Sequence, residues 1–357
     1  MKQGYRVGIA GASSLLGQEL LRVLKERAFP LSRLLTFESD DQEPDLPVVD
    51  LSEHLESVVA GEDVSPADLD FVFLAARREQ MPSSLRRVLE ACRLTGTSST
   101  SSVPRCVVID LGEALTEPSG DAPAAVMSIP FLERSLPGTP GLPPARIIAS
   151  AYPAVIVLSG LLLRLAKRFT PRNAVASVLS PASELGPRGI EELQKQTVNL
   201  LSFQKIPRNV FGAQLAFNLL AQLGGKHAAE LADLEHRLRR QLRQYLANRV
   251  PMPAFRVFQA PVFYSLAVSL YVETEEPQPP EALAMALAGE HIHVRRRSEP
   301  SPSQVEAAGS SDILVDTIAV DADHPAGIWI WAAVDNIRLA AVNAVEIAES
   351  LRDRLRP

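Results

Sequence analysis

The stretch that decides the fold is Tyr5-Arg-Val-Gly-Ile-Ala10 followed by Gly11-Ala-Ser-Ser-Leu-Leu-Gly17. Its first half is compact and rich in Val and Ile, which is typical of a buried β-strand. Its second half starts and ends with glycine and contains two serines, which favours a tight turn into a helix N-terminus. Leucines then recur on one helical face, at Leu16, Leu20, Leu21 and Leu24. The sequence here predicts a strand, a tight turn and an amphipathic helix.

The same alternation continues along the first part of the chain. Apolar runs at 34–37, 71–75 and 107–109 predict further strands, and the pattern of 82–94 predicts a helix. Strands that alternate with helices form a parallel sheet with helices on both faces. We therefore expect an α/β fold with a Rossmann-like parallel sheet, interrupted by a Ser/Thr/Gly surface loop at 96–102.

The second part of the chain has a different pattern. After the Pro-rich tract 123–144, which we take as the domain boundary, strands are expected at 147–148, 174–179, 262–272 and 328–334, and helices at 153–165, 190–204 and 229–246. This mixture predicts an α+β domain over residues 131–334. A last helix, with Ile337, Ala341 and Leu351 on one face, should pack back on the first domain. The Rossmann-like domain would then comprise 1–130 and 335–357.

Composition and charge exclude several classes of protein. Among 357 residues, 46% are hydrophobic, and 36 Lys+Arg against 42 Asp+Glu give a net charge of 36 − 42 = −6. Extensive disorder and a nucleic-acid-binding surface are not expected, because the chain is apolar enough to form cores and its basic run is the short 295–297. Cys92 and Cys106 cannot form a disulfide framework or a zinc site, which fits a reducing cytoplasm. Polar residues interrupt the uncharged stretch 147–163, so no membrane span is expected.

The turn Gly11–Gly17 occupies the place of a dinucleotide-binding fingerprint. In that motif the first glycine permits the sharp turn, the last permits close helix packing, and the helix N-terminus faces a pyrophosphate. The middle glycine is Ser14 here, so a side chain stands where bare backbone approaches phosphate, although its hydroxyl can also donate to one. A turn that binds no cofactor remains the alternative.

Several short strings carry a resemblance to a known family. They are Val7-Gly-Ile-Ala-Gly-Ala12 with Gly17-Gln-Glu-Leu20, Ile147-Ile-Ala149, Leu215-Ala-Phe-Asn-Leu219, Ala260-Pro-Val-Phe263, and Asp335-Asn-Ile-Arg338 followed by Ala340-Ala-Val-Asn-Ala344. On these strings the chain resembles the aspartate-semialdehyde dehydrogenases over essentially its whole length, and most of all their Usg-type homologues. The resemblance implies a homodimer, formed through the second domain, with a dinucleotide or another small molecule as ligand.

The resemblance also implies a mechanism that this sequence no longer supports. In the family a cysteine thiolate after the Ile-Ile-Ala string forms a thioester with the substrate, which is β-aspartyl phosphate or the semialdehyde. Here the nucleophile's position is Pro153, which has neither a sulfur nor a backbone N–H. The acid/base histidine lies in a Gly-His-Ser string that reads Ser265-Leu266-Ala267. We therefore expect no catalytic residues at these positions.

Anion-binding positions of the family are also changed. The substrate-binding arginine corresponds to Gln259, the phosphate-binding arginine falls near Thr116, and a helix lysine maps near Asp233. The remaining thiols do not replace the nucleophile, because Cys92 and Cys106 are expected in the core of the first domain. The expected protein is a catalytically silent, dimeric binding or regulatory relative.

The cofactor side keeps only part of the family pattern. The family's Ala-Gly-Gly string becomes Ala75-Ala-Arg77, and after the second strand Glu38 and its acidic neighbours replace a serine and an arginine. Because carboxylates repel a 2′-phosphate and accept from a ribose hydroxyl, any NAD or NADP binding should tilt toward NAD. The residues expected to contact such a cofactor are Gly11, Ser13, Ser14, Leu15, Gly17, Glu38 and Asn336, with Arg77 or Arg78 as additional pyrophosphate contacts or, alternatively, as solvated loop residues.

A second interpretation is an oxidoreductase that acts on an aldehyde or acyl phosphate by an altered mechanism. Ser150 and Tyr152 are the hydroxyls nearest to the lost thiol, but no neighbouring histidine supplies a base. The charges at Glu184, Arg188, Glu191 and Glu192 are explained by helix capping and solvation. His291 and His293 would share a strand face, yet no third ligand stands nearby in the sequence, so no metal site is expected.

Overall fold

A computed structural model describes residues 4–37, 55–58, 69–76, 85, 106–112, 125–136 and 147–355. The chain divides into two compact units: unit 1 comprises 1–151 and 340–357, and unit 2 comprises 152–339. These boundaries differ from the expected ones at 130/131 and 334/335. The first boundary moves because strand β7 (Ile147–Ser150), which follows the Pro-rich tract, belongs to the parallel sheet of unit 1.

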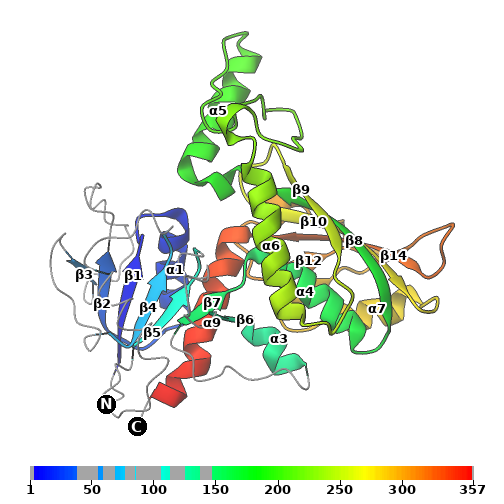
Figure 1. Cartoon of the computed structure of the whole chain (residues 1–357), viewed down its shortest axis with the longest axis horizontal. Helices are drawn as coiled ribbons and strands as arrows, with labels where there is room; N and C mark the ends of the chain where they lie inside the picture. The colour runs from blue at the N-terminus through cyan, green and yellow to red at the C-terminus, as the bar shows by residue number, and fades with distance from the viewer. Residues whose placement is uncertain are drawn as a thin grey trace. The chain divides into compact units, whose positions relative to one another are not determined.

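Unit 1 is built on a seven-stranded sheet in which every strand pair is parallel. The spatial order is β3-β2-β1-β4-β5-β7-β6 (Figure 1). The strands other than β7 are β1 (Tyr5–Ala10), β2 (Leu31–Phe37), β3 (Leu55–Val58), β4 (Phe71–Leu74), β5 (Val107–Asp110) and β6 (Val126–Ser128). The helices are α1 (Leu15–Glu26), α3 (Pro130–Ser135) and α9 (Asn336–Leu355), of which the part from residue 340 onward belongs to unit 1.

Alternate residues of the central strands enter two separate cores, as expected for a sheet buried on both faces. On β4, Phe71 and Phe73 join a core with α1 and α9, whereas Val72 and Leu74 join a second core. The α9 side chains of the first core are Ala341, Val342, Ala344, Val345, Ile347, Ala348 and Leu351. The prediction that the last helix packs on the Rossmann-like sheet is therefore confirmed.

Unit 2 contains a mixed sheet in the order β11-β12-β14-β10-β8-β9, with β13 paired to β14. Its strands are β8 (Pro171–Ser180), β9 (Ala254–Gln259), β10 (Leu266–Thr274), β11 (Ile292–Val294), β12 (Ile313–Val315), β13 (Ala319–Val320) and β14 (Gly327–Val334). The pairs β8–β9 and β11–β12 are parallel, and the remaining pairs are antiparallel. The expected α/β class with a second, mixed α+β unit is confirmed.

The helices of unit 2 are α4 (Pro153–Ala166), α5 (Gly186–Leu201), α6 (Glu230–Leu246), α7 (Pro280–Leu287) and α8 (Gln304–Ala307). α4 is buried over nearly its whole length and contacts β8, β10, α6 and α7, so one side of the sheet is covered (Figure 1). In the described part of the chain, no helix is both long and apolar enough to cross a bilayer.

One expected strand needs correction, and two other expected segments fall outside the described residues. The expected strand 262–272 begins only at Leu266, because Ser265 takes a left-handed conformation with φ 68° and ends the preceding turn. The expected helix 82–94, apart from residue 85, and the expected loop 96–102 lie outside the described residues.

Candidate functional site

The glycine turn of unit 1 is tight for steric reasons. Gly11 has φ 75°, and its N–H donates to the Phe37 carbonyl over 2.8 Å. A Cβ on Gly17 would lie 2.1 Å from the Gly11 oxygen, so the start of α1 packs directly on the turn. The turn therefore has the sharp bend and close helix contact of a dinucleotide-binding strand–helix unit.

Ser14 completes this turn with its side chain. Its Oγ accepts the Gly17 N–H over 3.0 Å as the N-cap of α1, and donates to the Ala75 carbonyl over 3.3 Å. The hydroxyl that could have donated to a phosphate is thus engaged by the end of β4. Ser13 and Leu15 flank this cap, and the Ser13 carbonyl accepts from Gln18. The first turn of α1 has no acidic residue to oppose an anion.

In unit 2, Pro153 is the first residue of α4, where a proline ring fits and no N–H is required by the helix. The preceding residue, Tyr152, donates its N–H to Oε1 of the buried Gln241 over 2.9 Å. This bond joins the start of α4 to α6. The position that the resemblance assigns to the nucleophile is therefore a well-fixed helix N-terminus that presents neither a thiol nor an amide hydrogen.

Glu184 lies beside Tyr152 and was missed as a site residue. The Tyr152 hydroxyl donates to Oε2 of Glu184, and Nδ2 of Asn336 donates to Oε1 over 2.6 Å. Glu184 is held in the short 3₁₀ helix Ala182–Leu185 that follows β8. The interpretation of Glu184 as a capping or solvated charge is wrong, because its carboxylate joins residues 32 and 152 positions away.

Asn336 is engaged on both sides of its amide. Besides Glu184, its Nδ2 donates to Ser183 Oγ over 3.3 Å, and its Oδ1 accepts the Ser265 N–H over 3.2 Å. The neighbouring Asp335 caps α9 by accepting the N–H groups of Ile337 and Arg338 over 3.0 and 2.9 Å. We call Tyr152, Ser183, Glu184, Ser265 and Asn336 the polar cluster of unit 2.

The two other positions that the resemblance assigns to catalytic and substrate-binding residues lie at strand ends near this cluster. Leu266 starts β10 directly after Ser265 and is buried. Gln259 ends β9, is buried, and donates its Nε2 to the Ser180 carbonyl over 2.9 Å at the end of β8. Its amide thus joins two strand ends within the protein. The hydroxyls of Ser180 and Ser265 are buried and have no hydrogen-bond partner among the residues that the structure describes.

Ser150, the other hydroxyl considered at sequence level, lies in unit 1 at the end of β7. It is buried and accepts from Nδ2 of Asn343 on α9 over 2.9 Å. The same amide donates to the Ser128 carbonyl at the end of β6. Ser150 therefore helps to attach α9 to two strands of the sheet.

Several predicted residues lie outside the described part of the chain. These are Glu38, Arg77, Arg78, Cys92 and Thr116. Cys106 directly precedes β5 and is fully buried in the core, and Asp233 is exposed in the first turn of α6.

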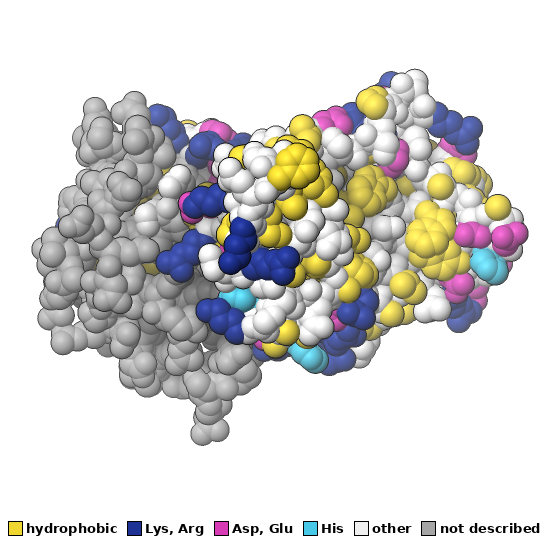
Figure 2. All heavy atoms as spheres, turned by 90° about the horizontal axis from the view of Figure 1, so that it is seen from above, with side chains coloured by type: hydrophobic (Ala, Val, Ile, Leu, Met, Phe, Trp, Pro, Cys, Tyr) yellow, Lys and Arg dark blue, Asp and Glu magenta, His cyan; other side chains and the backbone are white. Residues whose placement is uncertain are grey.

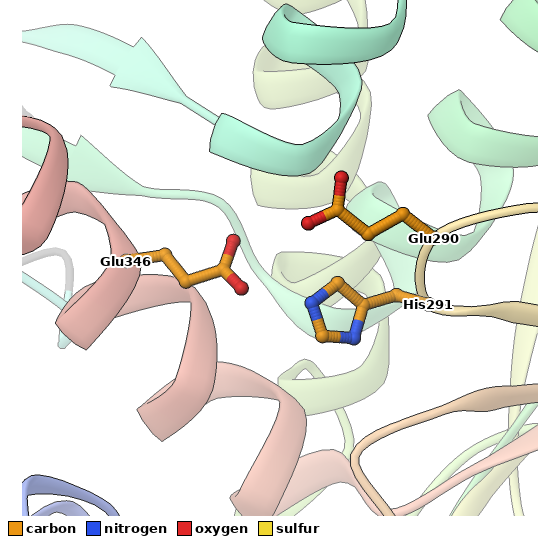
Figure 3. Close-up of side chains that lie close together, drawn as sticks. All are labelled: Glu290, His291 and Glu346. Atoms are coloured by element: carbon orange, nitrogen blue, oxygen red, sulfur yellow. The ribbon is translucent and has the colours of Figure 1, made fainter. Parts of the chain in front are cut away.

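The histidine pair does not share a strand face. His291 has φ 57° and precedes β11, whereas His293 lies within β11 and is exposed. Figure 3 shows Glu290 and His291 on the connection before β11, and Glu346 on α9. Glu290 and His291 belong to unit 2, while Glu346 belongs to unit 1, where it pairs with Arg134 over 2.9 Å. Because these three residues belong to two different units, they are described separately, and His291 and His293 do not act as a pair of ligands on one strand face.

The polar cluster can orient a proton at the Tyr152 hydroxyl, because a carboxylate accepts from that group and an amide fixes the carboxylate. The Glu184 carboxylate gives the polar cluster a negative charge at the Tyr152 hydroxyl. This arrangement differs from an anion-binding site, which presents cations or N–H groups to its ligand.

Comparison with known proteins relates both units to one family. Residues 162–339 match the semialdehyde dehydrogenase dimerisation domain. A USG-1 protein homologue of Pseudomonas aeruginosa is 30% identical over 98% of each chain, and the aspartate-semialdehyde dehydrogenase of Rickettsia bellii is 24% identical over the same shares.

Solved structures agree with this result. A probable aspartate-semialdehyde dehydrogenase from Pseudomonas aeruginosa superimposes with a TM-score of 0.80 at 27% identity, covering 98% of this chain and 99% of that one. Aspartate semialdehyde dehydrogenase II from Vibrio cholerae has the same fold, with a TM-score of 0.79 at 24% identity and the same coverage. Because the similarity spans nearly the full length of both units, the chain belongs to the aspartate-semialdehyde dehydrogenase family.

Proposed function

We propose that this chain is a family member that has lost the thioester chemistry and acts as a homodimeric binding or regulatory protein. The observation that carries the proposal is Pro153 at the first position of α4. A thioester requires a sulfur nucleophile, and a helix N-terminus stabilises a thiolate and an oxyanion through its N–H groups. Pro153 supplies neither group.

The neighbouring positions support the same conclusion. Leu266 cannot transfer a proton, and the Gln259 amide is directed to the Ser180 carbonyl. Glu184 adds a carboxylate that accepts from the Tyr152 hydroxyl. An anionic acyl phosphate would be repelled by this charge.

Binding of a dinucleotide is proposed as a weak, retained property. One relative of the same fold, from Candida albicans, was solved with NADP, with a TM-score of 0.64 at 13% identity. The tight turn at Gly11 and Gly17 and the uncharged first turn of α1 fit a pyrophosphate, which the backbone from Gly11 to Leu15 would hold. Ser14 already donates its hydroxyl to the Ala75 carbonyl, so the turn offers a pyrophosphate one donor fewer. Glu38 and Asn336 remain proposed contacts of the cofactor, and the Glu38 carboxylate would favour NAD over NADP.

Dimerisation is proposed through the open face of the unit 2 sheet. Tyr271 lies in register with Val175 on one side and Trp329 on the other, so three large side chains form a row across β8, β10 and β14. Val175 is 50% exposed and Trp329 45% exposed, although both are apolar. Such a row is typical of a surface that a second copy covers.

The dimer interface can be tested with one charge. Val175→Glu should convert the dimer to a monomer in sedimentation velocity, since burying an unpaired carboxylate is unfavourable. Val305→Glu is the matched control, because Val305 is 88% exposed and lies outside the row. A monomeric wild-type protein, or a dimer that survives Val175→Glu, would contradict this assignment.

The second candidate is an NAD(P)-dependent oxidoreductase that uses no covalent intermediate. The observation favouring it is the Tyr152–Glu184 bond, which supplies the proton-accepting partner that the sequence does not reveal. A bound NAD(P)H would supply the hydride to a carbonyl carbon. Tyr152 would hold the proton that the carbonyl oxygen receives, and Glu184 would orient the hydroxyl.

Two measurements separate the candidates. In the first, NADH and NADPH fluorescence is titrated with the purified protein; weak binding that favours NADH supports the silent-binder proposal. In the second, phosphate-dependent oxidation of aspartate semialdehyde is followed by the absorbance of the reduced cofactor, and no turnover above background is expected. Phosphate-dependent turnover of aspartate semialdehyde would refute the proposed loss of catalytic activity. Turnover of an aldehyde that Tyr152→Phe abolishes would establish the oxidoreductase instead.

A further inference from the structure

Exposed apolar side chains are concentrated on unit 2. Among the described residues, every large apolar side chain that is exposed belongs to this unit. Several of them lie on α5 and the chain that follows it, residues 186–224, which we call the α5 arm. Val198 is 55% exposed, Leu201 69% and Phe203 99%. Figure 1 shows α5 projecting beyond the end of the unit 2 sheet, and Figure 2, which looks onto this end, shows apolar side chains gathered on it.

The α5 arm is held in place by two buried polar side chains of the helix. Glu192 accepts three consecutive N–H groups, from residues 209 to 211, over 2.7 to 3.1 Å. Gln196 donates to two carbonyls and accepts two N–H groups between residues 207 and 216. Because these groups are satisfied and buried, the irregular chain after α5 has a fixed conformation. The interpretation of Glu192 as a solvated or capping charge is therefore wrong.

Phe203 stands at the end of α5 in a conformation that suits glycine. Its N–H donates to the Leu200 carbonyl over 3.2 Å, and the Gln204 N–H donates to the Asn199 carbonyl over 2.7 Å. These two bonds form a Schellman motif, in which the residue at the position of Phe203 is left-handed and is usually glycine. With φ 54°, a bulky side chain is held in a strained backbone conformation and is also exposed to water. Phe217 repeats this combination, with φ 59° and 67% exposure. Neither the fold nor solvation favours phenylalanine at these positions, whereas contact with another surface does.

The exposed face of α5 carries no net charge. Glu191 and Lys195 precede Val198 and Leu201 on this face, at spacings of three and four residues. Lys195 pairs with Glu191, so the cation is compensated. Over the whole helix, two basic and two acidic side chains give 2 − 2 = 0. An apolar surface without net charge is typical of the contact between two copies of one chain, and gives no preference for a strongly charged partner.

We infer that the α5 arm is a second contact region of the homodimer and packs on unit 2 of a second copy of this chain. The inference rests on the proposed homodimer and adds to the row of Val175, Tyr271 and Trp329. The whole arm lies within residues 162–339, which match the semialdehyde dehydrogenase dimerisation domain. In a two-fold dimer, a contact of one residue with a second is repeated with the copies exchanged, so an arm away from the axis meets a different surface of the partner. Each such contact therefore occurs twice.

The size of the proposed row supports a second contact region. A stable interface buries about 800 Å² on each partner. Complete burial of three large side chains removes roughly 600 Å², at about 200 Å² each. Val175 and Trp329 are already half covered by their own unit, so the row offers less than this. The row provides only part of the area that a stable dimer needs, and Val198, Leu201 and Phe203 supply further apolar area on the same unit.

The test measures the dissociation constant of the dimer by sedimentation of the full chain over a dilution series. Phe203→Gly removes the apolar side chain and relieves the left-handed strain in the same step, so this variant is expected to fold. Its Kd should be at least about tenfold higher than that of the wild-type chain, since each dimer loses the contact twice. Leu201→Ser should raise the Kd to a similar extent.

Each variant has a matched control outside the α5 arm. Ala247→Gly is the control for Phe203→Gly, because Ala247 also ends a helix in a left-handed conformation, with φ 46°, and is exposed without a large side chain. Met285→Ser is the control for Leu201→Ser, because Met285 is 69% exposed on α7. Both controls should leave the Kd of the dimer unchanged, and circular dichroism should show that all four variants fold.

The outcomes separate this inference from the proposed homodimer. A wild-type chain that remains monomeric overturns both. A wild-type dimer whose Kd is unchanged by Phe203→Gly and Leu201→Ser overturns only the contact of the α5 arm, as does an equal rise of the Kd in the two controls. Binding of the wild-type chain to vesicles of phosphatidylcholine and phosphatidylglycerol, lost in the two arm variants while their dimers persist, overturns it as well, since the arm would then face a membrane.

Discussion

Replacing Pro153 with Cys returns the family's nucleophile to the first position of α4 and tests the proposed loss of function directly. The N–H at this helix position has no intrahelical partner, so a cysteine leaves the hydrogen bonds of α4 unchanged. Tyr152 already has an extended conformation, with φ −64° and ψ 145°, which is acceptable before either residue. We expect the variant to fold, with a change in the free energy of unfolding below about 1 kcal/mol.

The expected gain in activity is nevertheless negligible. A nucleophile is worth about 10⁴-fold or more only when the groups that act with it are present. General acid/base catalysis contributes a further ~10²- to 10⁴-fold, and Leu266 cannot provide it. Gln259 is neutral and donates to the Ser180 carbonyl, so no cation is gained for the substrate. Adding Leu266→His and Gln259→Arg should therefore raise kcat/KM by at least about 10²-fold over Pro153→Cys alone.

The assay is phosphate-dependent turnover of aspartate semialdehyde, followed by the absorbance of the reduced cofactor, with both NAD and NADP. Pro280→Cys is the matched control, because Pro280 is the first residue of α7 and the variant places a thiol at a comparable helix N-terminus outside the polar cluster. The single variant Pro153→Cys should not exceed this control. Clear turnover by Pro153→Cys alone would refute the argument that Leu266 and Gln259 also remove function.

Three further substitutions test individual features of unit 2. Ser265→Gly should raise the free energy of unfolding by about 1 kcal/mol in urea titrations, because φ 68° is strained for serine and its buried hydroxyl has no partner in the described part of the chain; a decrease would contradict this. Glu192→Ala should lower it by roughly 3 kcal/mol and expose amides 209–211 to hydrogen exchange, since three buried N–H groups lose their acceptor; unchanged protection would refute the role of this carboxylate. Burial, together with a hydrogen bond to Glu273 and its charge, raises the pKa of Tyr271, so Glu273→Gln should lower that pKa in ultraviolet difference titrations against Tyr271→Phe. The pKa of Tyr271 is higher in the folded than in the unfolded state. Its contribution to stability is therefore fully present below the unfolded-state pKa and is lost as the pH rises through the folded-state pKa. If Glu273→Gln left the titration of Tyr271 unaltered, the bond to Glu273 would be excluded as a cause of the raised pKa.

Local patterns were sufficient to predict much of the fold. Strand β1 and helix α1 follow from an apolar run, a glycine turn and leucines at helical spacing, all of which are signals within a few residues. Strand β9 was not predicted, although Phe255 and Val257 alternate with exposed residues in it. A strand of this length has too few alternations to be distinguished from a loop. The left-handed Ser265 was missed because that conformation is more typical of glycine.

The candidate site was predictable only where its residues are neighbours in the sequence. The turn around Gly11 and Gly17 was recognised because the bend and the helix packing impose glycine at a fixed spacing. The bonds of Glu184 to Tyr152 and Asn336 were not, because they span 32 and 152 residues and depend on how β8, α4 and α9 meet. No spacing rule connects such residues, so the partner of the Tyr152 hydroxyl required the folded structure.

The Glu184 carboxylate is also relevant to the proposed loss of the thiol. A negative charge beside a cysteine disfavours the thiolate and raises the thiol pKa, which opposes nucleophilic attack. Glu184 is bonded to the hydroxyl of Tyr152, the residue directly before Pro153. A cysteine at position 153 would be disfavoured as a thiolate wherever its sulfur came close to this carboxylate. Pro153 has no ionisable group, and the carboxylate has no effect of this kind on it. The Tyr152–Glu184 pair is therefore compatible with a chain that performs no thioester chemistry and unfavourable for one that does.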